Sequence, residues 1–183
     1  MKWLDNYIQR RRFNAAAKHI LQKSTLLDIG CNRGEFFTFL GKKQISGTGI
    51  DPQSENPVSG LPANVTIIQS VFPTEKLAGQ KFDVITVLAV FEHIPKCDQE
   101  NFAQACHEIL VHKGQVIVTV PSPLVDIILA ILQFFRIIDA MSLEQHYGFD
   151  PRETVPLFTQ AGFKLIRHRK FELGLNNLFV FEK

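Results

Sequence analysis

The chain has 183 residues, of which 45% are hydrophobic and 21% are charged, and its formal net charge is +2 at pH 7. This length and composition suit one globular domain with one good hydrophobic core, so residues 1–183 are expected to form a single domain. The net charge is too small to indicate nucleic acid as a partner. The three cysteines have no paired spacing, which predicts neither a disulfide framework nor a metal site.

Residues 1–22 are predicted to form an N-terminal helix. The segment is polar and differs from a secretory leader, so a cytoplasmic location is expected. It carries the basic run Arg10–Arg12, whose simplest interpretation is a solvent-exposed face of the helix.

A strand, a tight turn and a helix are predicted next. The apolar Leu26 and Leu27, followed by Asp28, indicate the end of a buried strand. Gly30–Gly34 then form the turn, and Glu35–Leu40 form the helix. Glycines between a strand and a helix let a ligand approach the backbone, because no Cβ intrudes there. The free N–H groups at the start of the helix suit a negatively charged ligand group.

A second acidic residue, Asp51, ends the next apolar run, Ile45–Ile50. An acid at the end of the second strand, about 20 residues past a glycine turn, is placed to bind both hydroxyls of a ribose. Asp28 and Asp51 each have a plainer interpretation as caps of the turns that follow them. Their joint placement at strand ends favours binding, so the sequence predicts a nucleoside-cofactor site.

Five further strands are predicted, at Val65–Gln69, Lys81–Leu88, Gly114–Val120, Lys164–Phe171 and Asn177–Glu182. Gly114 is expected to close the helix that precedes the fifth strand. Asp150–Glu153 has an N-cap, a proline at the first helical position and a capping-box acid, and that helix is expected to end at Ala161–Phe163. Apolar strands separated by helices predict an α/β fold, with a mostly parallel sheet covered on both faces and a terminal hairpin.

The order Asp28-x-Gly30-x-Asn32-x-Gly34 resembles the first motif of class I S-adenosylmethionine-dependent methyltransferases, which usually carry glycine where Asn32 stands. Asparagine tolerates the left-handed conformation better than most residues, so the turn is expected to survive the change. Residues 82–85 and 91–94, Phe-Asp-Val-Ile and Phe-Glu-His-Ile, look like the fourth-strand motif of this family. The resemblance implies a doubly wound, Rossmann-like sheet of seven strands, mostly parallel with an antiparallel C-terminal strand.

The resemblance also implies S-adenosylmethionine as the cofactor and S-adenosylhomocysteine as its product. By that pattern Asp28 orders the methionine end of the cofactor. The backbone at Gly30, Cys31 and Gly34 lies alongside this end, within the turn that contains Asn32. The family leaves a second interpretation open for the run Arg10–Arg12, in which one arginine reaches the cofactor's carboxylate.

At the nucleoside end the resemblance implies six residues, namely Asp51, Pro52, Ser70, Val71, Leu88 and Ala89. The aspartate binds the ribose, the proline borders the adenine, and residues 70–72 supply the other edge of the adenine. The family often has aspartate where Ser70 stands, so this side chain departs from the expected adenine contact. The two residues after the fourth strand would offer a backbone carbonyl to the adenine amino group.

His93 is the candidate acid–base residue, because it follows the fourth strand and histidine works near neutral pH. The alternative is a structural hydrogen-bonding role at a helix start. For Glu92 the interpretation as an exposed acid at a helix start is preferred over that of a base. Cys31 is interpreted as a small turn residue and not as a nucleophile, since no partner spacing supports catalysis.

Residues 121–147 are predicted to be an insertion after the fifth strand, strongly apolar between residues 124 and 141. The segment is too polar and too short to read as a membrane span. Three uses remain open, namely a lid over the acceptor pocket, a homodimer contact, or a peripheral helix on a membrane surface. The family pattern favours the lid, and an apolar lid suits a lipophilic acceptor. His146 and Tyr147, which close the segment, are candidates to face the acceptor or are packing residues.

These observations predict an enzyme that moves the methyl group of S-adenosylmethionine to a small or lipid-linked acceptor by in-line displacement, with oxygen the preferred target. Two alternatives stand beside it. One is a catalytically inactive module that binds the same cofactor, and the other is an NAD-type oxidoreductase with a similar sheet. The absence of the pattern G-x-G-x-x-G speaks against the oxidoreductase.

Overall fold

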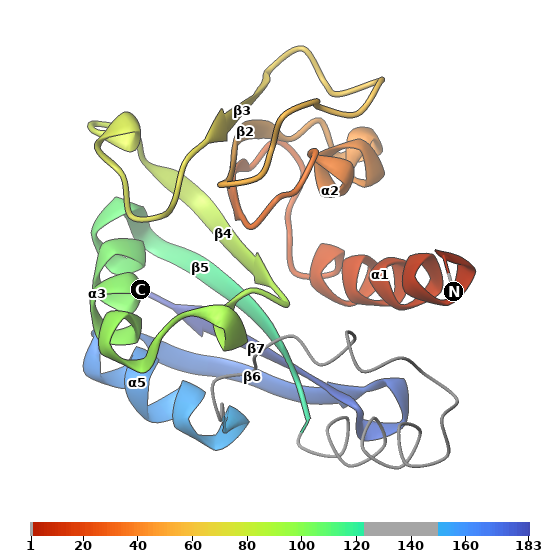
Figure 1. The fold of residues 1–183 in the computed structure, drawn as a ribbon. Coiled ribbons are helices and arrows are strands. Elements are labelled where there is room, and N and C mark those ends of the chain that lie inside the picture. Colours follow the sequence, from red (N-terminus) through yellow and green to blue (C-terminus); the bar gives the residue numbers. More distant parts are fainter. Residues whose placement is uncertain (1, 123–149) are drawn as a thin grey trace.

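The computed structural model describes residues 2–122 and 150–183, and within them seven strands form one sheet (Figure 1). The strands are β1 (Thr25–Ile29), β2 (Ser46–Asp51), β3 (Val65–Gln69), β4 (Phe82–Leu88), β5 (Leu110–Pro121), β6 (Lys164–Phe171) and β7 (Asn176–Glu182). Their order across the sheet is β3-β2-β1-β4-β5-β7-β6. The first five strands pair in parallel, and β7 is antiparallel to both β5 and β6. The predicted fold class is confirmed.

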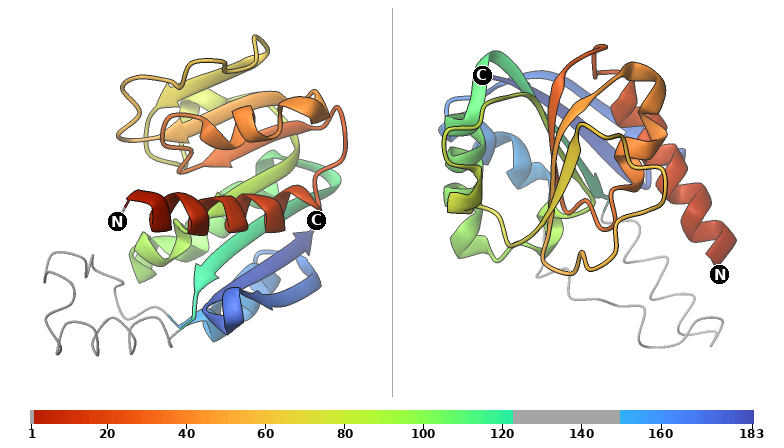
Figure 2. Two further views of the ribbon diagram at one scale, coloured as in Figure 1. Left: turned by 90° about the vertical axis from the view of Figure 1, so that its right-hand side faces the viewer. Right: turned by 90° about the horizontal axis from the view of Figure 1, so that it is seen from above.

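Helices cover both faces of the sheet. The α-helices are α1 (Lys2–Ala17), α2 (Glu35–Phe39), α3 (Lys96–Ile109) and α5 (Thr154–Gln160), and short 3-10 turns include η3 (Phe91–His93), η5 (Pro151–Glu153) and η6 (Glu172–Gly174). Figure 2 shows α1 and α2 on one side of the sheet and α3 and α5 on the other. No helix among the described residues is long and apolar enough to cross a membrane.

Alternation along the strands divides the core in two. Successive side chains of a strand point to opposite faces, so neighbouring apolar residues enter different cores. In β1, for example, Leu26 belongs to the same core cluster as Phe36 of α2, while Leu27 belongs to the cluster that contains Phe102 of α3 and Phe158 of α5. Both faces of the central strands are therefore apolar, which accounts for their continuous hydrophobic runs.

The strand order reverses between β1 and β4. Both strands run in the same direction and are paired, but their connections leave to opposite sides of this junction. In open α/β sheets, ligands bind at the carboxyl ends of the strands where the order reverses. The fold thus places the predicted turn and Asp28 at the edge where a ligand is expected.

Two of the predicted helix ends are wrong. Helix α1 ends at Ala17 and not at residue 22, because the chain then turns through i to i−3 hydrogen bonds and buries Ile20 in the core. Gly114 does not close a helix: α3 ends at Ile109 and β5 begins at once. The register of β5 against β4 shifts at this point, and the bulge places Gly114 inside the strand.

The helix start near Asp150 is confirmed in part. The Asp150 side chain accepts a hydrogen bond from the Arg152 amide at 2.9 Å, as an N-cap does. It caps the 3-10 turn η5, however, and α5 begins only after that turn. Glu153, expected to complete a capping box, instead pairs with Lys96 of α3 at 3.0 Å. The Glu153 carboxylate thus forms an ion pair with a residue of α3, and the predicted capping box does not form.

Candidate cofactor site at the carboxyl edge of the sheet

The turn after β1 is built from left-handed residues. Gly30, Asn32 and Gly34 have φ angles of 74°, 49° and 87°. Asn32 thus adopts the conformation expected of it. A Cβ added to Gly30 would lie 2.1 Å from Val90 Cγ2, so this position requires glycine for both conformation and space. Val90 therefore packs directly against the backbone at Gly30.

Asp51 holds the turn in place. Its Oδ2 accepts a hydrogen bond from the Asn32 amide at 2.9 Å, and its Oδ1 accepts one from the Gln53 amide at 2.8 Å. The carboxylate therefore links the end of β2 to the turn after β1. Each oxygen keeps a lone pair for a further donor. The interpretation of Asp51 as a cap is thus observed, and it is compatible with ribose binding.

Asp28 is buried one residue before the end of β1. It is 3% exposed, and its Oδ1 accepts a hydrogen bond from the Thr86 hydroxyl of β4 at 2.6 Å. Burial, helped by the nearby Glu35 and Asp51, raises the pKa of Asp28 to about 7, although the Thr86 hydrogen bond lowers it in part. A carboxyl group with a pKa near 7 is partly protonated at neutral pH, and it releases its proton readily when a cation approaches.

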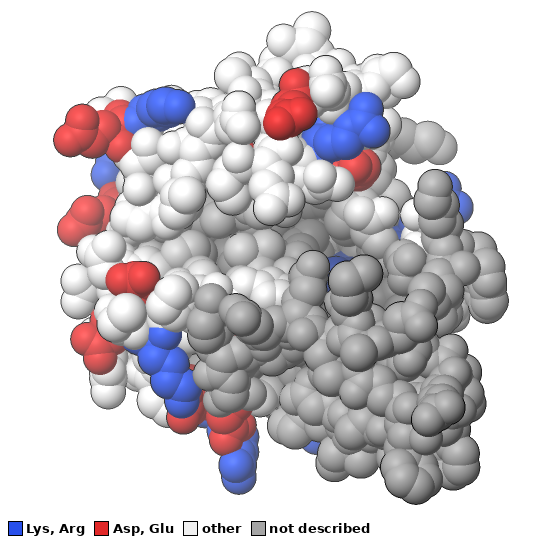
Figure 3. All heavy atoms as spheres, viewed as in Figure 1, with Lys and Arg blue, Asp and Glu red and all other residues white. Residues whose placement is uncertain are grey.

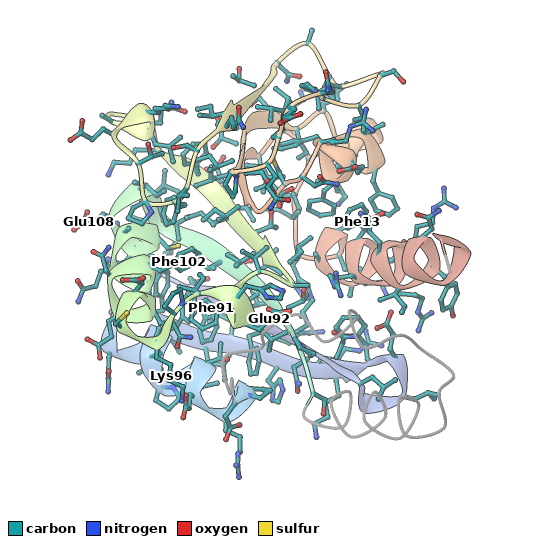
Figure 4. The ribbon with its side chains drawn as sticks, viewed as in Figure 1. Phe13, Phe91, Glu92, Lys96, Phe102 and Glu108 are labelled. Atoms are coloured by element: carbon teal, nitrogen blue, oxygen red, sulfur yellow. The ribbon has the colours of Figure 1, made fainter. Side chains whose placement is uncertain are left out.

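A cavity of about 410 Å³ opens beside the turn. Five of the predicted site residues line it, namely Gly30, Pro52, Ser70, Val71 and His93. Phe72 and Phe102 both line the cavity, and their rings pack edge-on at 5.1 Å between centroids. Figure 4 shows Phe102 on α3 with Phe91 close beside it. In Figure 3 the middle of the visible face is hollowed, and most of the described atoms around the hollow are uncharged. The shape and lining suit a flat heterocycle.

Sequence reasoning missed part of the lining. Val90, Ile94 and Pro95 flank η3, while Asp98 and Asn101 belong to the first turns of α3. The spacing of Asp98 and Asn101 puts both on one side of the helix, and that helix follows β4 at the carboxyl edge. The position of these residues after the fourth strand could therefore have indicated that they line the site.

The remaining predicted residues lie outside the lining of this cavity. They are Asp28, Cys31, Asn32, Gly34, Asp51, Leu88 and Ala89. Most of them build the adjoining turn or the strand ends beneath it. The Ala89 amide donates to the Thr119 carbonyl of β5 at 2.9 Å, so this residue fastens the end of β4. His146 and Tyr147, with most of the insertion at residues 121–147, lie outside the described residues.

Cys31 is a packed turn residue. It is 4% exposed, and burial raises the pKa of its thiol well above the usual range. A thiol that resists ionisation is a poor nucleophile. The structure thus agrees with the interpretation of Cys31 as a small residue of the turn.

Glu92 overturns an expectation. It was expected to be an exposed acid at a helix start, but only 2% of its surface is exposed. Residue 92 lies in η3 between Phe91, which is buried, and His93, which is exposed and lines the cavity. Burial raises the pKa of Glu92 to about 7, although Arg12 lowers it in part. The η3 turn rotates the side chain inward, which a reading of the sequence as an ordinary helix start does not foresee.

Replacing Gly30 by alanine is expected to cost about 2–3 kcal/mol of stability, from the left-handed backbone and the clash with Val90. The double variant Gly30→Ala with Val90→Ala should recover the part due to the clash and keep the part due to the backbone. Urea unfolding of the single and double variants measures both parts. Equal stability of Gly30→Ala and the wild type would contradict this account of the turn.

A doubly wound sheet with a glycine turn, two acidic residues and a cavity at its reversal point defines a Rossmann-like domain that binds a nucleoside cofactor. Comparison with known proteins agrees with this description and also indicates the class of enzyme. Residues 2–168 match the model of a family described as a methyltransferase domain. The chain belongs to this family, and its class is the S-adenosylmethionine-dependent methyltransferases of class I.

Among curated proteins, the ubiquinone biosynthesis O-methyltransferase of Pseudomonas paraeruginosa is 33% identical over 105 residues, which cover 52% of this chain and 44% of that protein. The protein of the same name from Psychrobacter arcticus is 26% identical over 151 residues, covering 75% and 58%. The chain thus spans about half the length of the curated relatives it matches.

Solved structures share the fold. The 1,6-didemethyltoxoflavin-N1-methyltransferase of Burkholderia thailandensis, with S-adenosylhomocysteine bound, has a TM-score of 0.72 at 16% identity and covers 99% of this chain and 80% of its own. The cyclopropane synthase MmaA2 of Mycobacterium tuberculosis has a TM-score of 0.68 at 15% identity, covering 96% and 84%. The cofactor of this class is S-adenosylmethionine, and the cavity that Gly30 and Pro52 line beside the turn fits it.

Proposed function

We propose that this chain transfers the methyl group of S-adenosylmethionine to a hydroxyl oxygen of a small or lipid-linked acceptor. The observation that carries the proposal is a cavity of about 410 Å³ lined by Gly30 and Pro52, beside the turn that Asp51 anchors and the strand end that contains Asp28. The preference for oxygen rests on relatives whose names include O-methyltransferase.

In this proposal the cavity receives the adenosine. Asp51 accepts hydrogen bonds from the ribose hydroxyls with the lone pairs that the turn leaves free, and Pro52, Ser70 and Val71 border the adenine. Asp98 and Asn101 add polar groups at the same wall, where Ser70 replaces the aspartate of the family pattern. These contacts orient the nucleoside.

The methionine end lies along the turn toward Asp28. The cofactor supplies an activated methyl group, so the chain has only to position the acceptor in line and to exclude water. Asp28, already near the point of ionisation, gains charge as the positively charged methionine end approaches. His93 remains a candidate acid–base residue, exposed at the rim of the cavity.

The test combines binding with transfer. Isothermal titration with S-adenosylhomocysteine should show binding, while NAD should show none under the same conditions. Transfer of a radiolabelled methyl group from S-adenosylmethionine to hydroxyl compounds then separates an enzyme from a module that only binds. Binding without any transfer would favour the inactive module, and binding of NAD alone would refute the proposal.

A further inference from the structure

A second cavity, of about 480 Å³, lies beside the β6–β7 hairpin. Its lining comes from η5 with its N-cap, from the start of α5, and from Ser122, His168, Lys170, Asn177 and Phe179. Figure 1 shows α5 beside β6 and β7, at the other end of the sheet from β2 and β3. Among the described residues, none lines both this cavity and the cofactor cavity. We call it the hairpin cavity.

Strand register brings one wall of the hairpin cavity together. His168 pairs with Phe179 and Lys170 pairs with Asn177, two residues further along each strand. Residues two apart on a strand point to the same face, so these four side chains share one face of the hairpin. The His168 ring stacks on Phe179 with 4.3 Å between ring centroids. Phe179 belongs to the same core cluster as Phe158, so this is the face that α5 covers.

Asn177 is a buried amide with a free donor. It is 4% exposed, and its Oδ1 lies 3.0 Å from His168 Nε2. Because an amide oxygen can only accept, the histidine nitrogen donates to it. Asn177 Nδ2 forms no hydrogen bond with any residue that the structure describes. Since Asn177 lines the cavity, this nitrogen is left to donate to a group bound there.

Ser122 supplies a second buried polar group. It follows the carboxyl end of β5 and is 6% exposed. Its amide donates to the Leu175 carbonyl at 2.7 Å, which fixes the residue against the turn that leads into β7. Within the described part of the chain, its hydroxyl has no hydrogen-bond partner. Two neighbouring strands, β5 and β7, thus each bring an unpaired donor to the lining of the cavity.

The charged groups of the lining leave it positive. The only acid among its described residues is Asp150, which is paired with Arg152: the distance from Arg152 Nη2 to Asp150 Oδ2 is 2.8 Å. Lys170 is exposed, and in the described ranges it forms no ion pair. Because Arg152 offsets the charge of Asp150, the ammonium group of Lys170 gives the cavity a net positive charge.

These groups restrict what the hairpin cavity can bind. An amide N–H, a hydroxyl and an ammonium group all donate, so they suit the oxygen atoms of a carboxylate or a phosphate. An amine cation would meet another cation there and be repelled. Phe179, Val155 and Pro151 line the same space with apolar surface, which an inorganic anion would leave uncovered. The lining therefore matches an organic anion with an apolar body.

We propose that the hairpin cavity binds a small organic anion. Asn177 Nδ2, the Ser122 hydroxyl and Lys170 Nζ hold its carboxylate or phosphate group, and its apolar body lies against Phe179 and Val155. This site goes beyond the proposed function, because it needs no methyl transfer and shares no described lining residue with the cofactor cavity. The anion and S-adenosylhomocysteine therefore bind at the same time.

The experiment uses the full chain and probes that carry one ring, namely benzoate, phenyl phosphate, benzyl alcohol and benzylamine, together with inorganic phosphate. Binding of each is measured by titration, with and without saturating S-adenosylhomocysteine. Lys170→Gln removes the cation, and Asn177→Asp replaces the buried donor with an acceptor of the same size. Lys164→Gln is the matched control, because Lys164 is an exposed lysine of the same strand outside the cavity lining.

At least one of the two aromatic anions is expected to bind, and the tighter of them identifies the acidic group. Benzyl alcohol, benzylamine and inorganic phosphate should bind more weakly than that anion. Asn177→Asp should weaken its binding about 10-fold or more, because a buried donor is lost and a like charge is added. Lys170→Gln should weaken it about 5-fold, the effect of an exposed charge. Lys164→Gln and saturating S-adenosylhomocysteine should leave the affinity unchanged.

Several results would overturn the proposal. Binding of neither aromatic anion would remove the site, and benzyl alcohol or benzylamine binding as tightly as the anions would remove its ligand class. Wild-type affinity in Lys170→Gln and Asn177→Asp, or competition by S-adenosylhomocysteine, would place the anion elsewhere. Thermal unfolding checks each variant, and Lys170→Gln carries the test if Asn177→Asp does not fold. Failure of S-adenosylhomocysteine to bind counts against the proposed function alone, since the anion titrations are also run without it.

Discussion

Replacing Asp51 with alanine is expected to weaken S-adenosylhomocysteine binding about 30-fold or more. The carboxylate would lose two charge-assisted hydrogen bonds to the ribose, which together contribute roughly 2–4 kcal/mol. The turn would also lose its anchor, because Asp51 accepts from the amides of Asn32 and Gln53. Isothermal titration of the wild type and the variant measures the change.

A pair of variants separates the two causes. Asp51→Asn keeps one oxygen acceptor and should preserve part of the turn, so its affinity should fall between those of the wild type and Asp51→Ala. Glu55→Ala, which removes an exposed acid from the same loop, should bind as the wild type does. Undiminished affinity in Asp51→Ala would remove Asp51 from the site.

The unfolding free energy of the ligand-free chain is expected to fall as pH rises from about 4 to 8, and Asp28→Asn should remove much of this fall. Burial raises the pKa of Asp28 from 3.8 to about 7. Within that window the native state keeps a proton that the unfolded state has released, so each pH unit destabilises the fold by about 1.4 kcal/mol. The total for Asp28 is on the order of 4 kcal/mol.

The difference between the wild type and Asp28→Asn is the quantity to follow. Glu92 has a raised pKa as well and contributes a fall of the same sign that the Asp28 variant keeps. Urea unfolding at a series of pH values should therefore show that the unfolding free energy of the variant increases relative to that of the wild type as pH rises. Glu108→Gln, an exposed acid on α3, should run parallel to the wild type. A constant difference between wild type and Asp28→Asn would contradict the buried, protonated state.

The local elements were largely predictable from sequence. Strands β3 and β6 have the predicted limits, and β4 and β7 differ from prediction by one residue at their start. These strands carry β-branched and aromatic runs bounded by turn residues, a pattern that acts over a few neighbours. The left-handed turn with Asn32 was predictable for the same reason, since backbone sterics are local.

Contacts between segments distant in the sequence determined the element boundaries and side-chain roles that were predicted wrongly. The wrong boundary at Gly114 arose because pairing of Leu110 with Phe82 begins the strand early and needs a bulge. The wrong role of Glu153 arose because Lys96 lies across from it in space. Neither partner is near in sequence, so no local pattern shows which side chain will compete for the group.

For the site, the sequence by itself determined the residues that shape the backbone and end the strands: the Gly30 turn, Asp28 and Asp51. It could not determine which polar groups are buried, because burial depends on how helices and hairpins close over the sheet. The inward side chain of Glu92, and its approach to Arg12, exist only once α1 and η3 come together. Removal from water then sets the ionisation of Asp28 and Glu92, a property that no single segment of the chain possesses.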